Sequence, residues 1–470
     1  MSENIQKSPL PCGGGLGVGE TQSIKQGYKQ TSLGILPQEW EVVRLGEVCF
    51  VQSGGTPPKN EKSYWENGTI KWLGSSVCKN LHYIDEITDF ITEKGLQNSS
   101  AKIFKQGTTL IALVGATIGK VAFLNFEATT NQNIAGIYPQ DEKKLNQTFL
   151  FYISLMLHKE FIRLSSDKFK MANLSFIKSL QIPLPPLAEQ EKIAQILSVW
   201  DKGISVLKSL IEAKTKRKKA LMQRLLAPPC ESPTPSLRAS ETSAAIYNKS
   251  VDCHDLTASN LAMTEKNSKA KQSLRFAEFT DKWQEMRLGD ILQEKSIKNT
   301  SNVNLVLSVT NKQGFVAQKD YFEQEVASND TSNYKVIYKD EFAYNPARIN
   351  VGSIAMLEKF EIGILSPMYL VFKCLEKVDN CFFRYWLESY NFTGVLHRYL
   401  SGSVRETLSF NDMKTMHIFL PTLAEQKKIA QVLSACDKEI ELLKSKFQCL
   451  KTQKRGLMQR LLNGEVRVKC

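Results

Sequence analysis

This 470-residue chain contains short stretches that partly match known catalytic or cofactor-binding motifs, but their residues and spacing complete none of them. Gly115 to Lys120 has three residues between its glycines instead of the four of a phosphate-binding loop, and Val121 stands where that loop needs Ser or Thr for Mg²⁺. Residues 345–348 share only the first two positions of the Asn/Asp-Pro-Pro-aromatic loop of amino-methyltransferases. The five histidines are isolated and the ten cysteines include no CxxC pair, which argues against a zinc site. We therefore expect no catalytic residue, cofactor or metal in this chain.

A second pattern interleaves basic and aromatic side chains, a combination that suits nucleic-acid binding. It runs from Lys59 to Trp72 in a Gly/Pro-rich stretch, which predicts a surface loop. Basic residues also precede two copies of Leu-Ser-Phe, at 174–176 and 408–410. Lys and Arg neutralise phosphates and donate to base edges, but the alternative of core tryptophans and solvated lysines stays open. The candidate DNA-binding residues are Lys59, Lys62, Tyr64, Trp65, Lys71, Lys168, Lys170, Arg348 and Arg405.

Two long helices are expected to position these residues. Residues 187–226 and 423–462 align without a gap and are identical at 23 of 40 positions, including LAEQ at the start and LMQRLL at the end. The 236-residue spacing of the copies is far above the roughly 20 to 50 residues of solenoid repeats. Each copy therefore belongs to its own domain-sized unit, and the chain is a tandem of two such units.

Apolar residues recur in both copies with a 3.5-residue period over about five heptads. This period is typical of a coiled-coil seam and not of a strand or an ordinary amphipathic helix. The predicted seam and interface residues are Ile193, Leu197, Trp200, Ile204, Leu207, Ile211, Ile429, Leu433, Cys436, Ile440, Leu443 and Phe447.

The sequence of the two copies also predicts where each helix begins and how long it is. Pro185 and Pro186 precede the first helix, and Thr422 with Glu425 predicts a capping box at the start of the second. At 1.5 Å per residue each helix is about 60 Å long, roughly twice the width of a 150-residue domain. Each helix must therefore protrude and find a partner. An antiparallel pair within the chain and a parallel homodimer are both compatible with the residues.

A mixed α/β region precedes each helix. The two regions share Trp40-x3-Arg44 and Trp283-x3-Arg287 at their starts, but little between their edges. Short apolar strands are followed by aromatic-rich helical stretches near 149–164 and 381–400, so we predict an α/β (α+β) fold with two mixed domains joined by the long helices. The predicted boundaries are 1–36 for a flexible N-terminal segment, 37–186 for domain 1, 187–226 for helix 1, 227–272 for a flexible linker, 273–422 for domain 2, 423–462 for helix 2 and 463–470 for a tail.

The net charge of +13 suggests an anionic partner. Each helix copy holds nine Lys/Arg against four Asp/Glu, so ten of the 13 excess charges lie on the helices. A solvated helix face is the alternative reading of such a charge run. Without an apolar run of membrane-spanning length or the apolar core of a signal peptide, a cytoplasmic protein is expected.

Taken together, these residues resemble the specificity (S) subunit of type I restriction-modification enzymes. The resemblance covers most of the chain. It rests on Trp-x3-Arg-Leu-Gly-Asp/Glu at both domain starts, on SGGTP at 53–57, on NQNIAGIYP at 131–139, and on the paired exits IPLPPLAEQEKIAQIL and FLPTLAEQKKIAQVL. The linker of some 45 residues seen here is longer than the link usual in this family.

The resemblance implies a function without catalysis in this chain. Each α/β region would be a target recognition domain that reads one half of a bipartite, asymmetric double-stranded DNA site, and the two helices would pack as an antiparallel coiled coil. Two methyltransferase (M) subunits would dock on this coil. S-adenosylmethionine would belong to M, whereas ATP and Mg²⁺ would belong to a restriction (R) subunit.

Two other readings stay open at this point. The chain could be the specificity subunit of a related methyltransferase-only or type II-like system, or a coiled-coil DNA-binding scaffold without base specificity. A stand-alone nuclease or methyltransferase is the hypothesis of a different class, and activity of the purified chain on DNA would favour it. The basic faces of the helices could meet M or the phosphates of the DNA.

Overall fold

The computed structural model describes residues 26–80, 82–84, 87, 89–163, 171–229, 273–311, 313–321, 330–401 and 406–469. By its internal contacts the chain divides into two units, each considered by itself below. Unit 1 consists of residues 1–208 and 445–470, and unit 2 of residues 209–444. Each unit therefore contains one α/β domain and a part of both long helices. Most of the predicted linker, from residue 230 to its end, lies outside the described residues.

Unit 1 contains two four-stranded sheets and two strand pairs. The larger core lies on the sheet with the order β4-β11-β8-β9, in which all neighbours are antiparallel. The second sheet has the order β6-β5-β10-β7. The strands are β1 (Tyr28–Thr31), β2 (Gly34–Pro37), β3 (Glu41–Arg44), β4 (Cys49–Ser53), β5 (Ile70–Leu73), β6 (Asp89–Ile91), β7 (Ile103–Phe104), β8 (Thr109–Ala112), β9 (Val121–Phe123), β10 (Ala128–Thr130), β11 (Ile134–Pro139) and β12 (Gln181–Leu184).

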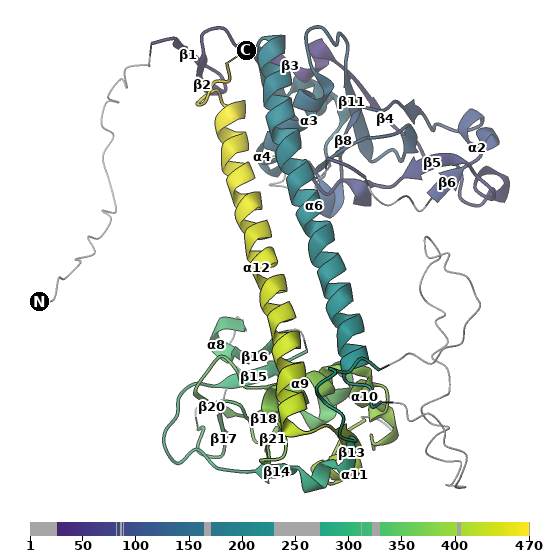
Figure 1. Ribbon diagram of the computed structural model, residues 1–470. Helices are drawn as coiled ribbons and strands as arrows, with labels where there is room; N and C mark the ends of the chain where they lie inside the picture. Colours follow the sequence, from purple (N-terminus) through teal and green to yellow (C-terminus); the bar gives the residue numbers. More distant parts are fainter. Residues whose placement is uncertain are drawn as a thin grey trace, which may run out of the picture. The chain divides into compact units, whose positions relative to one another are not determined.

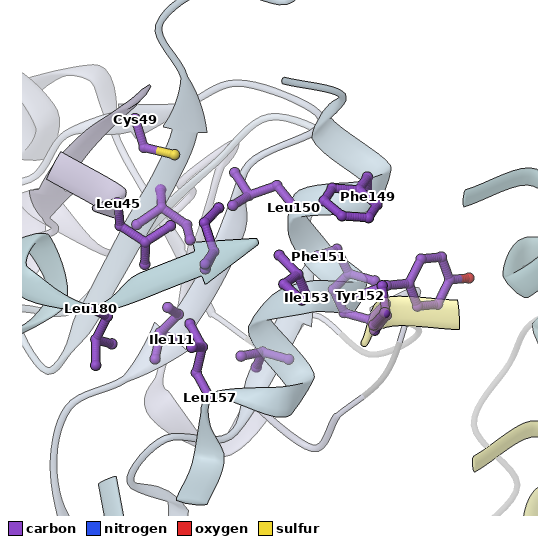
Figure 2. Close-up of a cluster of buried hydrophobic side chains, with 14 of the residues drawn as sticks. Leu45, Cys49, Ile111, Phe149, Leu150, Phe151, Tyr152, Ile153, Leu157 and Leu180 are labelled. Atoms are coloured by element: carbon purple, nitrogen blue, oxygen red, sulfur yellow. The ribbon is translucent and has the colours of Figure 1, made fainter. Parts of the chain in front are cut away.

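Helix α3 covers the first sheet because its sequence is almost entirely apolar. Its N-terminus is capped by Asn146, whose side chain accepts from the backbone N–H of Thr148 and Phe149. Figure 2 shows Phe149, Leu150 and Ile153 among the buried side chains of this core. The helical elements of unit 1 are α1 (Leu45–Val48), η1 (Lys62–Tyr64), η2 (Ser75–Val77), α2 (Glu93–Gln97), η3 (Gly115–Thr117), α3 (Gln147–Met156), α4 (His158–Arg163), α5 (Leu174–Ser179) and the first part of α6 (Leu187–Leu225).

The N-terminal segment corrects one prediction. Residues 1–36 were expected to be flexible, and residues 1–25 of this segment lie outside the described residues. In the described part, β1 and β2 pair in register from Tyr28 with Pro37 to Thr31 with Gly34. The Tyr28 hydroxyl donates to the carbonyl of Gly464, just after the second long helix, and Leu36 is buried. Figure 1 shows this hairpin beside the end of α12 (Leu423–Leu462). The partner of the hairpin lies more than 400 residues away in the chain, so a local reading of the sequence could not find it.

Unit 2 repeats the topology of the first sheet with different residues. Its four-stranded sheet has the order β14-β21-β18-β19, again antiparallel throughout. Asp379 caps α9 as Asn146 caps α3. The strands are β13 (Gln284–Arg287), β14 (Leu292–Lys295), β15 (Leu307–Thr310), β16 (Gly314–Ala317), β17 (Lys335–Tyr338), β18 (Phe342–Tyr344), β19 (Ile354–Met356), β20 (Ile362–Leu365), β21 (Leu370–Cys374) and β22 (His417–Leu420). The helical elements are η5 (Leu288–Asp290), α8 (Gln318–Tyr321), η6 (Pro346–Val351), α9 (Asn380–Glu388), α10 (Tyr390–Thr393), η7 (Leu396–Arg398) and α11 (Phe410–Thr415), with the end of α6 and the start of α12.

The two long helices are antiparallel in each unit. In unit 1 the start of α6, at Ile193 and Leu197, shares a core with Leu461 near the end of α12. In unit 2 the end of α6, at Leu225, shares a core with Ile429 near the start of α12. Early residues of one helix thus pack with late residues of the other. An antiparallel pair within one chain fits these contacts, and a parallel homodimer is not needed to cover the seam.

Close backbone approach explains one glycine of the domain 1 loop SGGTP. A Cβ added at Gly54 would lie 2.1 Å from the carbonyl oxygen of Thr130, whereas one added at Gly203 in α6 would meet no atom within 4 Å. We expect Gly54→Ala to weaken the pairing of β4 with β11 locally, because the added Cβ would push the backbones of Gly54 and Thr130 apart. Gly203→Ala should stabilise α6 by up to about 1 kcal/mol through helix propensity. Hydrogen exchange of peptides from β11 and α6 measures both. Unchanged exchange in β11 of Gly54→Ala would show that the loop yields freely.

Candidate nucleic-acid interface and helix pair

The start of each long helix holds its domain through a glutamine of the repeated LAEQ motif. Gln190 donates to the carbonyls of Lys144 (2.9 Å) and Pro185 (2.8 Å), and its own oxygen accepts from the N–H of Asn146 (2.9 Å). The equivalent Gln426 makes the same three hydrogen bonds in unit 2, at 2.9 to 3.1 Å. Both amides are buried. All six partners are backbone atoms, so the attachment does not depend on the side chains of the domain.

The glutamate of the same motif is held by an arginine that follows the other helix. Arg467, after the end of α12, donates to both carboxylate oxygens of Glu189 at 2.7 and 3.0 Å. The Trp40 indole N–H also donates to this carboxylate, at 2.9 Å. In unit 2, Arg275 contacts both oxygens of Glu425 at 2.9 Å. The hydrogen bonds to the two glutamates raise the pKa of both arginines, and both glutamates are buried, so each pair is a bidentate ion pair with a desolvated carboxylate.

This pair changes the predicted capping box at the second helix. The backbone N–H of Glu425 donates to the Thr422 hydroxyl at 3.4 Å, which is the first half of that motif. The Glu425 carboxylate, which should return to the backbone of Thr422, instead binds Arg275. A charged partner from the start of domain 2 is a stronger donor than a neutral backbone N–H, so the tertiary contact prevails over the local one.

Farther along, a lysine, an aspartate and a tyrosine meet where the helices and the domain come together. In unit 1, Asp201 of α6 accepts from Lys454 of α12 at 2.5 Å and from the Tyr152 hydroxyl of α3 at 2.7 Å. Burial, followed by the nearby Asp201 charge, raises the pKa of Tyr152. The tyrosine therefore stays protonated and donates, and the aspartate joins both helices to the domain.

Unit 2 contains the same trio with the roles of the helices exchanged. Asp437 of α12 accepts from Lys218 of α6 and from the Tyr385 hydroxyl of α9, at 2.7 and 2.8 Å. Asp437 lies 236 positions after Asp201, and Lys218 lies 236 positions before Lys454, which is the repeat spacing of the helices. The two units thus impose the same antiparallel register on the pair.

All twelve predicted seam residues are buried or half-buried. Six are buried: Ile193, Leu197, Leu207, Ile429, Leu433 and Ile440. Six are half-buried: Trp200, Ile204, Ile211, Cys436, Leu443 and Phe447. Continuing the heptad pattern along each helix leads to Lys218 and Lys454, which are charged residues at positions of an apolar seam. These two lysines form the ion pairs with Asp437 and Asp201.

The basic and aromatic stretch of domain 1 is divided between packing and exposure. Trp65 packs edge-to-face on Trp72, with ring centroids 5.2 Å apart, and donates to the Pro58 carbonyl. Lys71 lies over the Phe126 ring. Tyr64 is half-buried, with the Lys94 ammonium 5.8 Å from its ring centroid. The side chains left in solvent are those of Lys59 and Lys62.

Of the other candidate DNA-binding residues, the structure describes Arg348. Arg348 is exposed on η6. Asn345, at the start of the methyltransferase-like stretch, uses its side chain to accept from the N–H of Ala347 and thereby caps that short helix. Lys168, Lys170 and Arg405 lie outside the described residues.

The described residues include neither a metal-ligand cluster nor a membrane-spanning helix. Among them, no three His, Cys, Asp or Glu side chains are placed to hold a metal ion together. None of the described helices combines the length and the apolar character that crossing a membrane requires.

Comparison with known proteins identifies the family. The model of the type I restriction modification DNA specificity domain matches residues 37–214 and 280–452, about three quarters of the chain. The chain belongs to this family. It is 24% identical over 457 residues to the type I restriction enzyme MjaIX specificity subunit of Methanocaldococcus jannaschii, covering 94% of this chain and 96% of that one. To the MjaVIII specificity subunit of the same organism it is 23% identical over 466 residues, covering 92% and 94%.

A solved structure shares the fold. The type I restriction-modification S subunit from M. genitalium has a TM-score of 0.51 to this chain at 16% identity, with 90% of this chain and 96% of that chain covered. The chain is thus a specificity subunit of a type I restriction-modification system, with the fold of two α/β domains and two long antiparallel helices expected from its sequence.

In this specificity subunit, sequence reasoning missed the arginines that hold the LAEQ glutamates. A signal was available in the sequence. Residues 466–468 read Val-Arg-Val shortly after the second helix, and residues 274–276 read Leu-Arg-Phe at the start of domain 2, so an arginine between apolar residues recurs in both places. The linker interrupts the repeat after the first helix, which hides the correspondence.

A double-mutant cycle on Asp201→Asn and Lys454→Met tests the trio. Because these side chains are only 19% and 15% exposed, we expect a coupling energy of about 1 to 3 kcal/mol in the free energy of local unfolding of unit 1. Urea-dependent hydrogen exchange of α6 and α12 peptides measures it. The exposed pair Lys339–Glu361 is the control and should show no measurable coupling. Equal coupling in both pairs would contradict a role of the trio in helix pairing.

Replacing the arginines tests the two glutamate pairs separately. Arg467→Met leaves the Glu189 carboxylate with only the Trp40 donor, so we expect unit 1 to lose about 1 to 3 kcal/mol of stability while unit 2 is unaffected. Arg275→Met should have the opposite pattern. Hydrogen exchange resolved by unit reads out both, with Arg460→Ala on the exposed side of α12 as control. Destabilisation of both units by either variant would refute independent attachment.

Proposed function

We propose that this specificity subunit reads a bipartite, asymmetric DNA site, with one half-site for each domain. The observation that supports this proposal is the repeated attachment of the two domains. Sheets with equivalent strand orders are held by the same Glu, Gln and Asp positions of two helices that are identical at 23 of 40 positions. The residues between these attachments differ in the two domains. Unlike side chains on equivalent domains present unlike donors and acceptors to the bases of a groove. The expected target is therefore two different short sequences separated by unread base pairs.

The charge of the helices supports a second part of the proposal. Lys216, Arg217 and Lys219 are exposed on α6, where the described structure gives them no carboxylate partner. Such a cluster suits either the phosphates of the unread spacer or an acidic surface of M. We propose that two M subunits dock on the helix pair and that R subunits join this complex.

We further propose that the chain itself is not catalytic and acts in the cytoplasm. S-adenosylmethionine would be bound by M for adenine methylation, and ATP and Mg²⁺ by R for cleavage. The family membership of the chain and the similarity to specificity subunits over nearly its full length support this division of work. A stand-alone nuclease or methyltransferase would need residues that the sequence does not offer in a known spacing.

Mapping methylated adenines in cells that co-express the chain with its cognate M subunit tests the proposed function. We expect methylation within one asymmetric motif of two short parts separated by a fixed number of unspecified bases. The chain alone and M alone are the controls, and neither should methylate DNA. A single contiguous palindrome, or methylation by the chain alone, would reject the proposal.

The helix seam provides a separate test of partner docking. Ile204 and Ile440 occupy equivalent positions, with Ile440 buried and Ile204 half-buried. We expect Ile204→Asp with Ile440→Asp to separate the helices and to abolish the complex with M in size-exclusion chromatography, while both domains stay folded. Ser205→Asp is the matched control, because its equivalent in the second copy is already an acid, Glu441. Retention of the complex by the double variant would exclude the seam as the basis of docking.

A further inference from the structure

Three loops of unit 1 meet at one end of its first sheet. The end of β4 lies beside the start of β11, because Ser53 pairs with Ala135, and so does the end of β8, because Ala112 pairs with Ile134. The loops that follow β4 and β8 and the turn at 131–133 therefore share one edge of the domain. We call this edge the loop edge.

Backbone hydrogen bonds fix the loop edge of unit 1. The N–H of Leu113 donates to the carbonyl of Asn133 at 2.9 Å, and the N–H of Gly55 donates to that of Thr130 at 2.8 Å. The N–H of Ala172 donates to the carbonyl of Leu113 at 2.8 Å and brings a fourth segment to the same place. Side chains carried by these loops are thus presented from a rigid support, as base reading requires.

Gln132 is the exposed amide at the centre of this edge. The Thr56 hydroxyl donates to its oxygen at 2.6 Å, which orients the amide group. One lone pair of that oxygen and both N–H donors stay available among the described residues. An acceptor beside a donor on one planar group is what the major-groove edge of adenine requires, because adenine offers an N–H₂ donor at N6 and an acceptor at N7.

The loop edge of unit 2 is built in the same way. The end of β18 lies beside the start of β21, because Tyr344 pairs with Leu370. The Asn345 amide contacts the sulfur of Met368 at 3.6 Å, which joins the loop after β18 to the turn at 366–369. The N–H of Leu408 donates to the carbonyl of Pro346 and brings in the fourth segment, as Ala172 does in unit 1.

Arg348 is an exposed and charged side chain of this edge. Its neighbour Ile349 is 1% exposed and anchors η6 in the core, and Gly352, with φ of 87°, ends this short helix. Among the described residues, no carboxylate forms an ion pair with the Arg348 guanidinium. Arginine binds the O6 and N7 acceptors of guanine through two parallel donors. An arginine held at its backbone and free at its tip suits this contact.

We infer that Gln132 reads an adenine in one half-site and that Arg348 reads a guanine in the other. This inference rests on the proposed function and deepens it by naming one base-reading residue for each domain. A phosphate contact is the other role open to Arg348, and it would carry no sequence preference. The two roles therefore differ in what happens to the recognised sequence when the side chain is removed.

The experiment compares the methylated motifs of complexes of the cognate M subunit with the wild-type chain, with Gln132→Ala and with Arg348→Ala. We expect each variant to relax one position of one half-site, with about ten- to a hundred-fold loss of discrimination there, and to leave the other half-site unchanged. Gln132→Glu should favour cytosine at the same position, because a carboxylate accepts from the N4 amino group of cytosine. Gln97→Ala and Arg287→Ala are matched controls, since both residues are exposed but lie off the loop edge.

Each outcome bears on one proposal. A wild-type complex that methylates no two-part motif defeats the proposed function before any variant is compared. A two-part motif that stays unchanged in both alanine variants overturns the inference and leaves the proposed function intact. Binding titrations of the same complexes with DNA can show an affinity that falls equally for all sequences and depends less on salt. This result would identify phosphate contacts and would also overturn the inference. The other positions of the relaxed half-site, which should stay specified, report correct folding of the altered domain, and Arg348→Lys, which keeps the guanine preference in part, provides a second check.

Discussion

The contact on which the rest of the structure depends is the lysine of one long helix held by the aspartate of the other. A seam of apolar residues with a heptad period can slip by one heptad and still bury its side chains, so hydrophobic packing does not choose one register. The pairs Asp201–Lys454 and Asp437–Lys218 do, because a slipped register would leave charges at half-buried positions without partners. The same carboxylates accept from Tyr152 and Tyr385, so the register of the helices and the seating of each domain depend on one interaction.

The attachments through the LAEQ glutamines are independent of the side chains of the domain, whereas each aspartate attachment needs one domain tyrosine, Tyr152 or Tyr385. Gln190 and Gln426 bind backbone atoms alone, and the arginine partners of Glu189 and Glu425 come from segments outside the two sheets. A domain can therefore change most of its side chains and still be held, provided that its fold returns the same carbonyls to the same place. The differences are limited to details: the Trp40 indole binds Glu189, whereas the nitrogen of the equivalent Trp283 has no partner among the described residues.

The sequence predicted best what depends on periodicity. The long helices were expected at 187–226 and 423–462 and lie at Leu187–Leu225 and Leu423–Leu462, because a heptad pattern over 40 residues has few competing explanations. The β1–β2 hairpin was missed because its partner is distant in sequence. The arginines that bind Glu189 and Glu425 were missed because the long linker separates the first of their two apolar-Arg-apolar segments from its helix. The basic and aromatic stretch at 59–72 predicted a surface loop but not which of its side chains are exposed. Composition indicates exposure for a loop as a whole, but it does not separate Trp65, which packs on Trp72, from Lys62, which lies in solvent.

These constraints divide the molecule into positions that carry structure and positions that are free to carry information. On η6, Ile349 is buried and Asn345 holds the cap, so changes at either would cost stability, whereas Arg348 between them contacts solvent. At 131–133 the backbone of Asn133 holds the loop, and Gln132 projects from it with one fixed hydrogen bond. Exposed side chains on a fixed backbone can be exchanged at little energetic cost, because surface substitutions that break no packing or cap change stability by about 0.5 kcal/mol or less. A protein that must keep its partner contacts while its target sequence changes needs this separation, and the repeated helices together with the unlike loop edges provide it.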